Sequence, residues 1–229
     1  MAEISTGVKG IDNAVGGGIK PETIMLIYGE PETGKSALAM QIAVHCAKQN
    51  GKILYVDCDN TFSAKRLSQI AGENFDEVAD RIVLVKPRDF REQTVLIDHI
   101  EDYTTNVNLI VIDTFTSLYS AKAAESPRAF STNRELNRLL ALLAQTVKTK
   151  KIPLVIISQV RSVFNDQSES VRPVATRVLK FWADTILFLK PTELPQTIKA
   201  TVEKAPKLPA PSVCYIQIGE AGIRDTQLY

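Results

Sequence analysis

The sequence predicts one α/β domain whose sheet is mostly parallel, is flanked by helices and ends in an antiparallel portion. Apolar segments of strand type alternate with helical stretches through most of the chain, and a run of further strands follows them. A glycine-rich loop with the spacing of a phosphate-binding motif joins the first strand to the first long helix. The 229 residues suffice for a single domain with a full hydrophobic core, which we assign to residues 1–229.

Charge and cysteine content limit the classes of function. The chain has 27 Lys+Arg and 26 Asp+Glu, so any contact with a polyanion must be local. Cys46, Cys58 and Cys214 stand apart from one another, which predicts small core residues in a reducing compartment rather than a disulfide or metal framework. The chain shows neither a signal-peptide pattern nor a run of about 18 apolar residues. We therefore expect a soluble, cytoplasmic protein without a membrane partner.

The first elements surround the glycine-rich loop. Two glycine clusters, Thr6–Asp12 and Gly16–Ile19, predict turns. Ile24–Tyr28 is a short apolar strand, and Ala37–Lys48 has the composition of a helix. A strand before the loop and a helix after it are the context that a phosphate-binding loop requires.

The loop itself, Gly29–Ser36, meets every fixed position of G-x-x-x-x-G-K-[ST]. Its backbone N–H groups can turn toward phosphates at a helix N-terminus, Lys35 adds a positive charge for the β- and γ-phosphates, and the Ser36 hydroxyl can ligate Mg²⁺. The alternative is an ordinary glycine turn between a strand and a helix. The nucleotide-contacting candidates are Gly29, Glu30, Pro31, Glu32, Thr33, Gly34, Lys35, Ser36 and Ala37.

The middle of the chain alternates strands and helices. The predicted strands are Ile53–Asp57, Ile82–Val85 and Leu109–Asp113, and the predicted helices are Ser63–Ala71 and Gln93–Tyr103. Asp113 ends a run of four apolar residues, which in a phosphate-loop protein indicates the second, Mg²⁺-associated motif, acting through water. Any buried parallel strand can also end in Asp, so the pairing with the loop carries this interpretation.

The remaining elements complete the sheet. Small and charged residues with Pro127 predict a loop over Tyr119–Phe130. Thr132 and Glu135 form a candidate capping box for a long helix with a leucine stripe on its buried face. Leu154–Gln159 is a further buried strand, and Val160–Val174 is too long and polar for an ordinary connection. Three strands, Asp184–Lys190, Ile198–Glu203 and Val213–Ile218, are expected to form the antiparallel portion.

These segments, taken in order, resemble the core of the RecA/RadA recombinases, and most of all the short archaeal RadA paralogues of the RadB-like group. The matching segments span essentially the whole chain: Thr6–Asp12 with Gly16–Ile19, Gly29–Ser36, Tyr55–Leu67, Leu109–Thr114 and Ile156–Val160. The resemblance implies a RecA-like P-loop ATPase core that binds ATP and Mg²⁺ at a subunit interface. It also implies that Gln159 senses the γ-phosphate and that Arg66 stacks on adenine.

Two departures from the recombinase pattern bear on activity. Members that hydrolyse ATP usually carry Glu where this chain has Asp59, and that carboxylate positions the attacking water. Asp59 is one methylene shorter, and a misplacement of about 1 Å can cost on the order of 100-fold in rate, so we expect slow turnover. Full recombinases also carry an N-terminal helical domain, whereas this core begins almost at Met1. A regulatory or mediator role therefore fits better than strand exchange by this protein alone.

In the recombinases two loops face DNA, and here they correspond to residues 119–130 and 161–174. The first region, extended to Arg134, holds three basic residues against one acid, and the second, extended to Lys180, holds four against two. Such charge runs are otherwise solvated faces. The DNA-binding candidates are Arg128, Arg161 and Arg172; Arg172 could alternatively reach the γ-phosphate of a neighbouring subunit. Single-stranded DNA is the expected form.

Three hypotheses follow from these observations. The first is a weakly hydrolysing ATPase that binds DNA or modulates the main recombinase, or other paralogues, in recombination and repair, with weak self-association. The second is a nucleotide-gated protein-binding module without useful turnover. The third is a KaiC-like signalling ATPase, which shares the glycine-rich start and the phosphate loop. Outside these sites, His45 and His99 are interpreted as packed or surface histidines rather than bases, and Trp182 as a core residue rather than a base-stacking platform. Asp57 is assigned no role.

Overall fold

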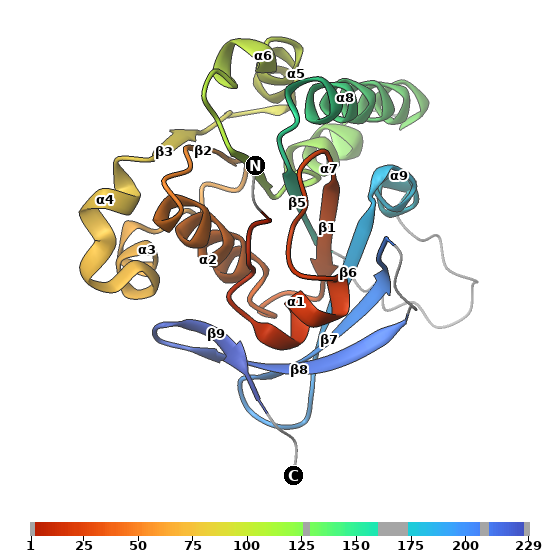
Figure 1. Cartoon of the computed structure of the whole chain (residues 1–229). Helices are drawn as coiled ribbons and strands as arrows, with labels where there is room; N and C mark the ends of the chain where they lie inside the picture. The colour runs from red at the N-terminus through yellow and green to blue at the C-terminus, as the bar shows by residue number, and fades with distance from the viewer. Residues whose placement is uncertain (1–2, 126–128, 160–173, 207–210, 227–229) are drawn as a thin grey trace, which may run out of the picture.

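The computed structural model describes residues 3–125, 129–159, 174–206 and 211–226 (Figure 1). Within them, nine strands form one sheet in the order β3-β2-β4-β5-β1-β6-β7-β8-β9. The strands are β1 (Ile24–Gly29), β2 (Ile53–Asp57), β3 (Ile82–Val85), β4 (Leu109–Asp113), β5 (Leu154–Gln159), β6 (Thr185–Pro191), β7 (Thr197–Lys204), β8 (Ser212–Gly219) and β9 (Gly222–Asp225). The strands from β1 to β6 pair in parallel, and β7, β8 and β9 add antiparallel hairpins beyond β6.

Helices cover both faces of this sheet. They are α1 (Lys9–Val15), α2 (Lys35–Lys48), α3 (Ala64–Ala71), the short 3₁₀ helix Gly72–Asn74, α4 (Phe75–Ala79), α5 (Phe90–Asp98), α6 (Ile100–Tyr103), α7 (Ser117–Glu125), α8 (Ala129–Lys150) and α9 (Val174–Trp182). Buried side chains of α1 to α4 form one core with alternate residues of the strands, and those of α5 to α9 form a second core on the opposite face. The result is the three-layer α/β/α arrangement that buried parallel strands require.

The predicted strands and the leucine stripe are confirmed. Ile53–Asp57, Ile82–Val85, Leu109–Asp113 and Leu154–Gln159 are strands with the predicted bounds. The stripe on α8 is fully buried in the second core, as its spacing requires: Leu136, Leu139, Leu140, Leu143 and Val147. Asp113 and Gln159 end neighbouring parallel strands, so both lie at the same edge of the sheet.

Several predictions about elements were wrong. The loop expected over residues 119–130 is largely helical: α7 runs through Glu125 and α8 begins at Ala129, so Thr132 lies inside α8 and is not its N-cap. Good helix formers in α7 and the burial of Tyr119 against Phe90, with ring centroids 6.0 Å apart, outweigh the turn signals. The first glycine cluster is not only turns, because α1 begins within it at Lys9 and runs to Val15.

The sheet also departs from the prediction at two strands and one helix. β6 pairs in parallel with β1 on one side and antiparallel with β7 on the other. The pairing with β1 is parallel because α9 carries the chain back along the sheet before β6 begins. The terminal strand β9 was not predicted. The expected helix Gln93–Tyr103 is divided into α5 and α6 at His99. Trp182 is half-buried rather than fully inside the core and donates from Nε1 to Asn137 Oδ1 at 2.9 Å.

Two of the three cysteines are buried core residues, as expected from their isolated positions in the sequence. Cys46 and Cys58 are buried, Cys214 is half-buried, and none of the three forms a disulfide. Burial raises the pKa of the Cys46 thiol to about 12.

In the described part of the chain, no helix combines the length and apolarity that a bilayer span needs.

Candidate nucleotide-binding site

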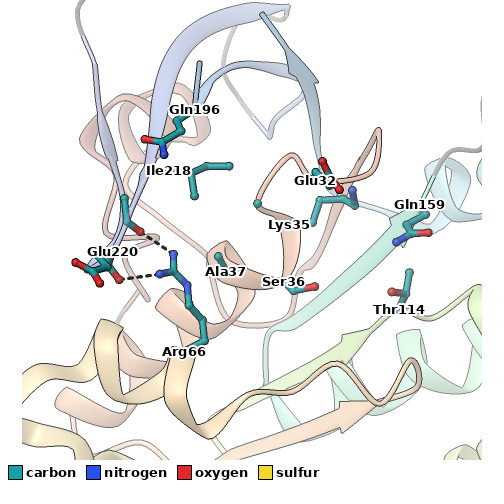
Figure 2. A pocket seen from close by; sticks show the side chains of 12 residues that line it. Glu32, Lys35, Ser36, Ala37, Arg66, Thr114, Gln159, Gln196, Ile218 and Glu220 are labelled. Carbon is teal, nitrogen blue, oxygen red and sulfur yellow. Dashed lines mark hydrogen bonds between the residues drawn. The ribbon is translucent and has the colours of Figure 1, made fainter. Parts of the chain in front are cut away.

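A pocket of about 660 Å³ opens where the phosphate loop meets the carboxyl ends of the central strands. Its lining consists of Glu32, Gly34, Lys35, Ser36, Ala37, Arg66, Thr114, Gln159, Gln196, Ile218, Gly219 and Glu220. Figure 2 shows Lys35, Ser36, Thr114 and Gln159 together on one side and Arg66, Gln196, Ile218 and Glu220 on the other. We call these the phosphate side and the roof side. A ligand with a charged end and a flat end would meet a different surface at each.

The phosphate loop is shaped by a glycine. Gly34 is the N-cap of α2 and lies in the left-handed region at φ 81°, which glycine adopts without a steric penalty. A Cβ placed there would come within 2.9 Å of the Ile218 side chain on the roof side. The Thr33 hydroxyl closes the loop by donating to the Glu30 carbonyl at 2.8 Å. The N-terminus of a 14-residue helix therefore faces the pocket, as an anion site requires.

Lys35 supplies the positive charge of the phosphate side. Its ammonium donates to the Glu30 carbonyl and, at 3.3 Å, to the Thr33 hydroxyl. Burial lowers the pKa of Lys35 from 10.5 to about 8, while the nearby carboxylates of Asp113 and Glu30 act in the opposite direction. A buried ammonium with partners that are mostly uncharged gains from an arriving anion, so Lys35 fits a phosphate ligand.

Asp113 lies beneath this lysine at the end of β4. Its side chain is 2% exposed, and Tyr55 donates a hydrogen bond to Asp113 Oδ2 at 2.9 Å. Burial raises the pKa of Asp113, and hydrogen bonds from Ser36 and Tyr55 partly offset that shift. A hydroxyl and a carboxylate joined in this way form the hard oxygen pair that suits Mg²⁺ beside a nucleotide.

Asp59 lies in the loop between β2 and α3. Its carboxylate accepts a short hydrogen bond from the hydroxyl of Thr114, which itself lines the pocket. Asp59 therefore contacts a residue of the phosphate side, although it does not itself line the pocket. The hydroxyl of Thr114 links the Asp59 loop to the end of β4, a connection that the sequence did not reveal.

Asp57, to which the sequence analysis assigned no role, organises the same loop. It is 1% exposed, and its two oxygens accept from the backbone N–H groups of Thr61 and Phe62, each at 3.0 Å. Lys86 Nζ lies 3.3 Å from Asp57 and donates to Asn60 at 3.0 Å. The sequence signal available for Asp57 was a buried acid at the end of a parallel strand, but its partners are backbone groups and Lys86, the residue that follows β3.

Gln159 and Arg66 lie on opposite sides of the pocket. Gln159 is the last residue of β5, in register with Gly29 on β1, and its side chain is exposed toward the pocket. Arg66 donates to the carbonyl oxygens of Gly219 at 2.9 Å and Glu220 at 2.7 Å, drawn as dashed lines in Figure 2. Arg66 thus forms part of the wall while its N–H groups hold the turn between β8 and β9.

Apart from Arg66, the roof side was absent from the sequence prediction. Its other residues come from β8 and from two hairpin turns of the antiparallel strands: Gln196 precedes β7, Gly219 ends β8, and Glu220 follows in the turn to β9. A backbone hydrogen bond from Ile218 N to Gln196 O, at 3.0 Å, joins the two turns. Turn residues in this part of the chain could be recognised from sequence, but their position over the phosphate loop could not.

The three DNA-binding candidates, Arg128, Arg161 and Arg172, lie outside the described residues. Two basic residues counted with the second loop are described, Arg177 and Lys180, both on α9; Arg177 is exposed, whereas Lys180 is ion-paired with Glu203 at 2.7 Å. Lys180 therefore contributes no free positive charge to that region. The first loop's Lys122 belongs to α7.

Comparisons with known proteins bear on the identity of this fold and pocket. The Rad51 family profile matches residues 1–226. The DNA repair and recombination protein RadB of Thermococcus onnurineus is 34% identical over 226 residues, covering 97% of each chain. RadB of Thermococcus kodakarensis is 33% identical over 98% of this chain and 100% of its own.

A solved structure supports the same assignment. The crystal structure of the RadB recombinase superposes with a TM-score of 0.83 at 32% sequence identity, covering 98% of this chain and 100% of its own. The agreement extends over the parallel sheet and the antiparallel C-terminal strands alike. By sequence and by structure, this chain belongs to the Rad51 family of RecA-like proteins, with RadB proteins among its relatives.

Proposed function

We propose that this chain is a Mg²⁺-dependent ATPase of slow turnover that acts in homologous recombination and DNA repair by modulating the main recombinase on DNA. The observation that carries the proposal is that Lys35 and Ser36 line one end of a single pocket and that the buried carboxylate of Asp113 is hydrogen-bonded to Ser36. Curated relatives of similar length are DNA repair and recombination proteins, and Rad51-family proteins are ATPases in general. The proposal therefore rests both on the chemistry of the pocket and on the functions of the related proteins.

The two sides of the pocket fit the two ends of ATP. The triphosphate would meet the loop N–H groups and Lys35, and the adenosine end would meet the wall formed by Arg66, Ile218 and Gly219. Ser36 and Asp113 would hold Mg²⁺, Asp113 through water, and the ion when bound neutralises charge on the phosphates. Among the described residues no cluster of three or more His, Cys, Asp or Glu could hold a metal, which suits an ion that is bound mainly by phosphate and water.

Asp59 and Gln159 are the proposed groups around the attacking water. Asp59 would orient the water, and Thr114 holds its carboxylate. Gln159 would report the γ-phosphate to the chain that follows β5. Because a carboxylate one methylene further out would reach the water better, Asp59→Glu should raise turnover by about tenfold or more at unchanged ATP affinity. The measurement is steady-state phosphate release, and an unchanged or lower rate would count against this role.

Steady-state ATP turnover with and without single-stranded DNA tests the proposal as a whole. Lys35→Ala, purified in the same way, measures contaminating ATPase. Turnover that DNA stimulates and that the variant lacks would support the proposed function. Measurable ATP binding without turnover above the Lys35→Ala level would instead favour the nucleotide-gated binding module.

A further inference from the structure

A hydrogen-bonded cluster lies on the opposite face of the sheet from α2, directly behind the phosphate loop. It consists of Tyr28 from β1, Lys180 from α9 and Glu203 from β7, which we call the Tyr28 triad. Tyr28 donates to Glu203 at 2.7 Å, and Lys180 donates to the Tyr28 hydroxyl at 2.6 Å and to Glu203 at 2.7 Å. Each member therefore contacts the other two, and the triad joins three elements that are distant in sequence.

The triad adds little to stability by itself. The side chains of Lys180 and Glu203 are 32% and 31% exposed, and an ion pair open to water to this degree contributes little to the free energy of folding. The Tyr28 ring is buried and packs on Phe188 with centroids 4.9 Å apart, a contact that a phenylalanine would keep. The hydroxyl forms the bridge to α9 and β7.

Tyr28 connects this bridge directly to the phosphate loop. Tyr28 is peptide-bonded to Gly29, the first residue of the phosphate loop, and Glu30 follows. The Glu30 carbonyl now accepts from the Lys35 ammonium. The Lys35 ammonium has three N–H donors, and a triphosphate attracts it away from the Glu30 carbonyl, so nucleotide binding perturbs the Glu30 peptide group, two residues from Tyr28.

We infer that the Tyr28 triad is a positioning device that couples the nucleotide state of the phosphate loop to the orientation of α9. The inference rests on the proposed function, because it requires a nucleotide in the pocket. Loop rearrangement moves the backbone at Gly29 and Tyr28, and the Tyr28 hydroxyl transmits this movement to Lys180 in the last turn of α9. By reciprocity, whatever displaces α9 alters the affinity of the loop for nucleotide.

The chain contains a natural reporter for this coupling. Trp182 is the only tryptophan of the sequence, two residues after Lys180, and its indole N–H donates to Asn137 on α8. A change in the orientation of α9 relative to α8 alters that hydrogen bond and the half-buried surroundings of the indole. The intrinsic fluorescence of the unlabelled protein therefore monitors α9.

The experiment compares ATP binding with the response of Trp182. Equilibrium dialysis with Mg·ATP gives the affinity of the protein for ATP. Tryptophan emission over the same titration gives the size of the fluorescence change that reports on α9. We expect a saturable emission change in the wild type with the same midpoint as binding. Tyr28→Phe and Lys180→Met should keep ATP affinity within about threefold but lose roughly half or more of the emission amplitude. Lys148→Met, which removes a lysine bond to the Glu22 carbonyl from α8, is the matched control and should keep the full amplitude.

The outcomes separate the inference from the proposed function. Wild-type protein that binds ATP without a change in emission, or a Tyr28→Phe variant that keeps the full amplitude, would overturn the inference and leave the nucleotide site intact. Wild-type protein that binds no ATP in dialysis would overturn the proposed function, and the inference with it. Unfolding curves of the variants identify any loss of signal that is due to misfolding.

Discussion

The phosphate side and the roof side of the pocket are built in different ways. The centre of the phosphate side is a continuous stretch, from β1 through the loop into α2, and central strands flank it on both edges of β1; Thr114 and Gln159 join it from the carboxyl ends of β4 and β5. The roof side is made of two hairpin turns, and the N–H groups of Arg66 connect the β8–β9 turn to α3, 153 residues away in sequence at Gly219. A local motif with fixed spacing forms the phosphate loop, whereas the side chain of Arg66 positions the β8–β9 turn of the roof side.

Disrupting the phosphate side should have the largest effect. A Cβ on Gly29 would lie 2.0 Å from the carbonyl oxygen of Leu189, so β1 and β6 would have to separate. Gly29→Ala should lower the free energy of unfolding by about 3 kcal/mol or more, measured by denaturant titration.

Gly72→Ala is the matched control for this prediction. Gly72 also has a positive φ, 64°, but no atom lies within 4 Å of its Cβ position. That substitution should cost only about 1 kcal/mol, because backbone strain acts alone. Equal losses at the two glycines would show that the contact with β6 is unimportant.

Disrupting the roof side should have a smaller and more selective effect. Arg66→Ala removes two charged hydrogen bonds to the β8–β9 turn, so ATP affinity should fall by about tenfold. Tripolyphosphate, which has no base, should bind with unchanged affinity in the same calorimetric assay. Arg81→Ala removes a similar arginine bond to a backbone carbonyl, that of Asn50, away from the pocket, and should change neither affinity. A parallel loss for both ligands would contradict the division into two sides.

The smallest expected effect is a proton that accompanies binding on the phosphate side. Lys35 has a pKa of about 8 without phosphate, and an adjacent anion favours the charged form, so ATP binding at pH 8.5 should take up roughly half a proton or more. Calorimetry in buffers of different ionisation enthalpy measures this uptake. Lys35→Arg, which stays charged, should abolish it, and uptake that persists in the variant would assign the proton to another group.

The lowered pKa of Lys35 also determines how its contribution to folding stability changes with pH. The unfolded chain holds the Lys35 proton up to about pH 10.5, whereas the folded chain loses it near pH 8. Between these values the unfolded state binds more protons, so the contribution of Lys35 to folding becomes more favourable as pH rises. Below pH 8 the full cost of burying the ammonium is present.

Sequence reasoning was most successful where structure is local. The loop spacing predicted Gly34, Lys35 and Ser36 in one pocket, and apolar runs placed β2 to β5 with their observed bounds. It was wrong at residues 119–130, because Pro127 and small polar residues suggested a loop while burial of Tyr119 favours a helix. Charge counting was wrong for Lys180, since its partner Glu203 lies on another strand.

Spacing within one segment was enough to predict the phosphate loop, most strands of the parallel sheet and the acid at the end of β4. The fold, in contrast, sets which turns close the pocket, which hydroxyl donates to Asp59, and which groups Arg66 and Lys180 bind. Those contacts join residues from separate elements, and their geometry depends on how strands pair and helices pack. The nucleotide end of the site is therefore readable in the sequence, whereas its roof and the Tyr28 triad are products of the fold.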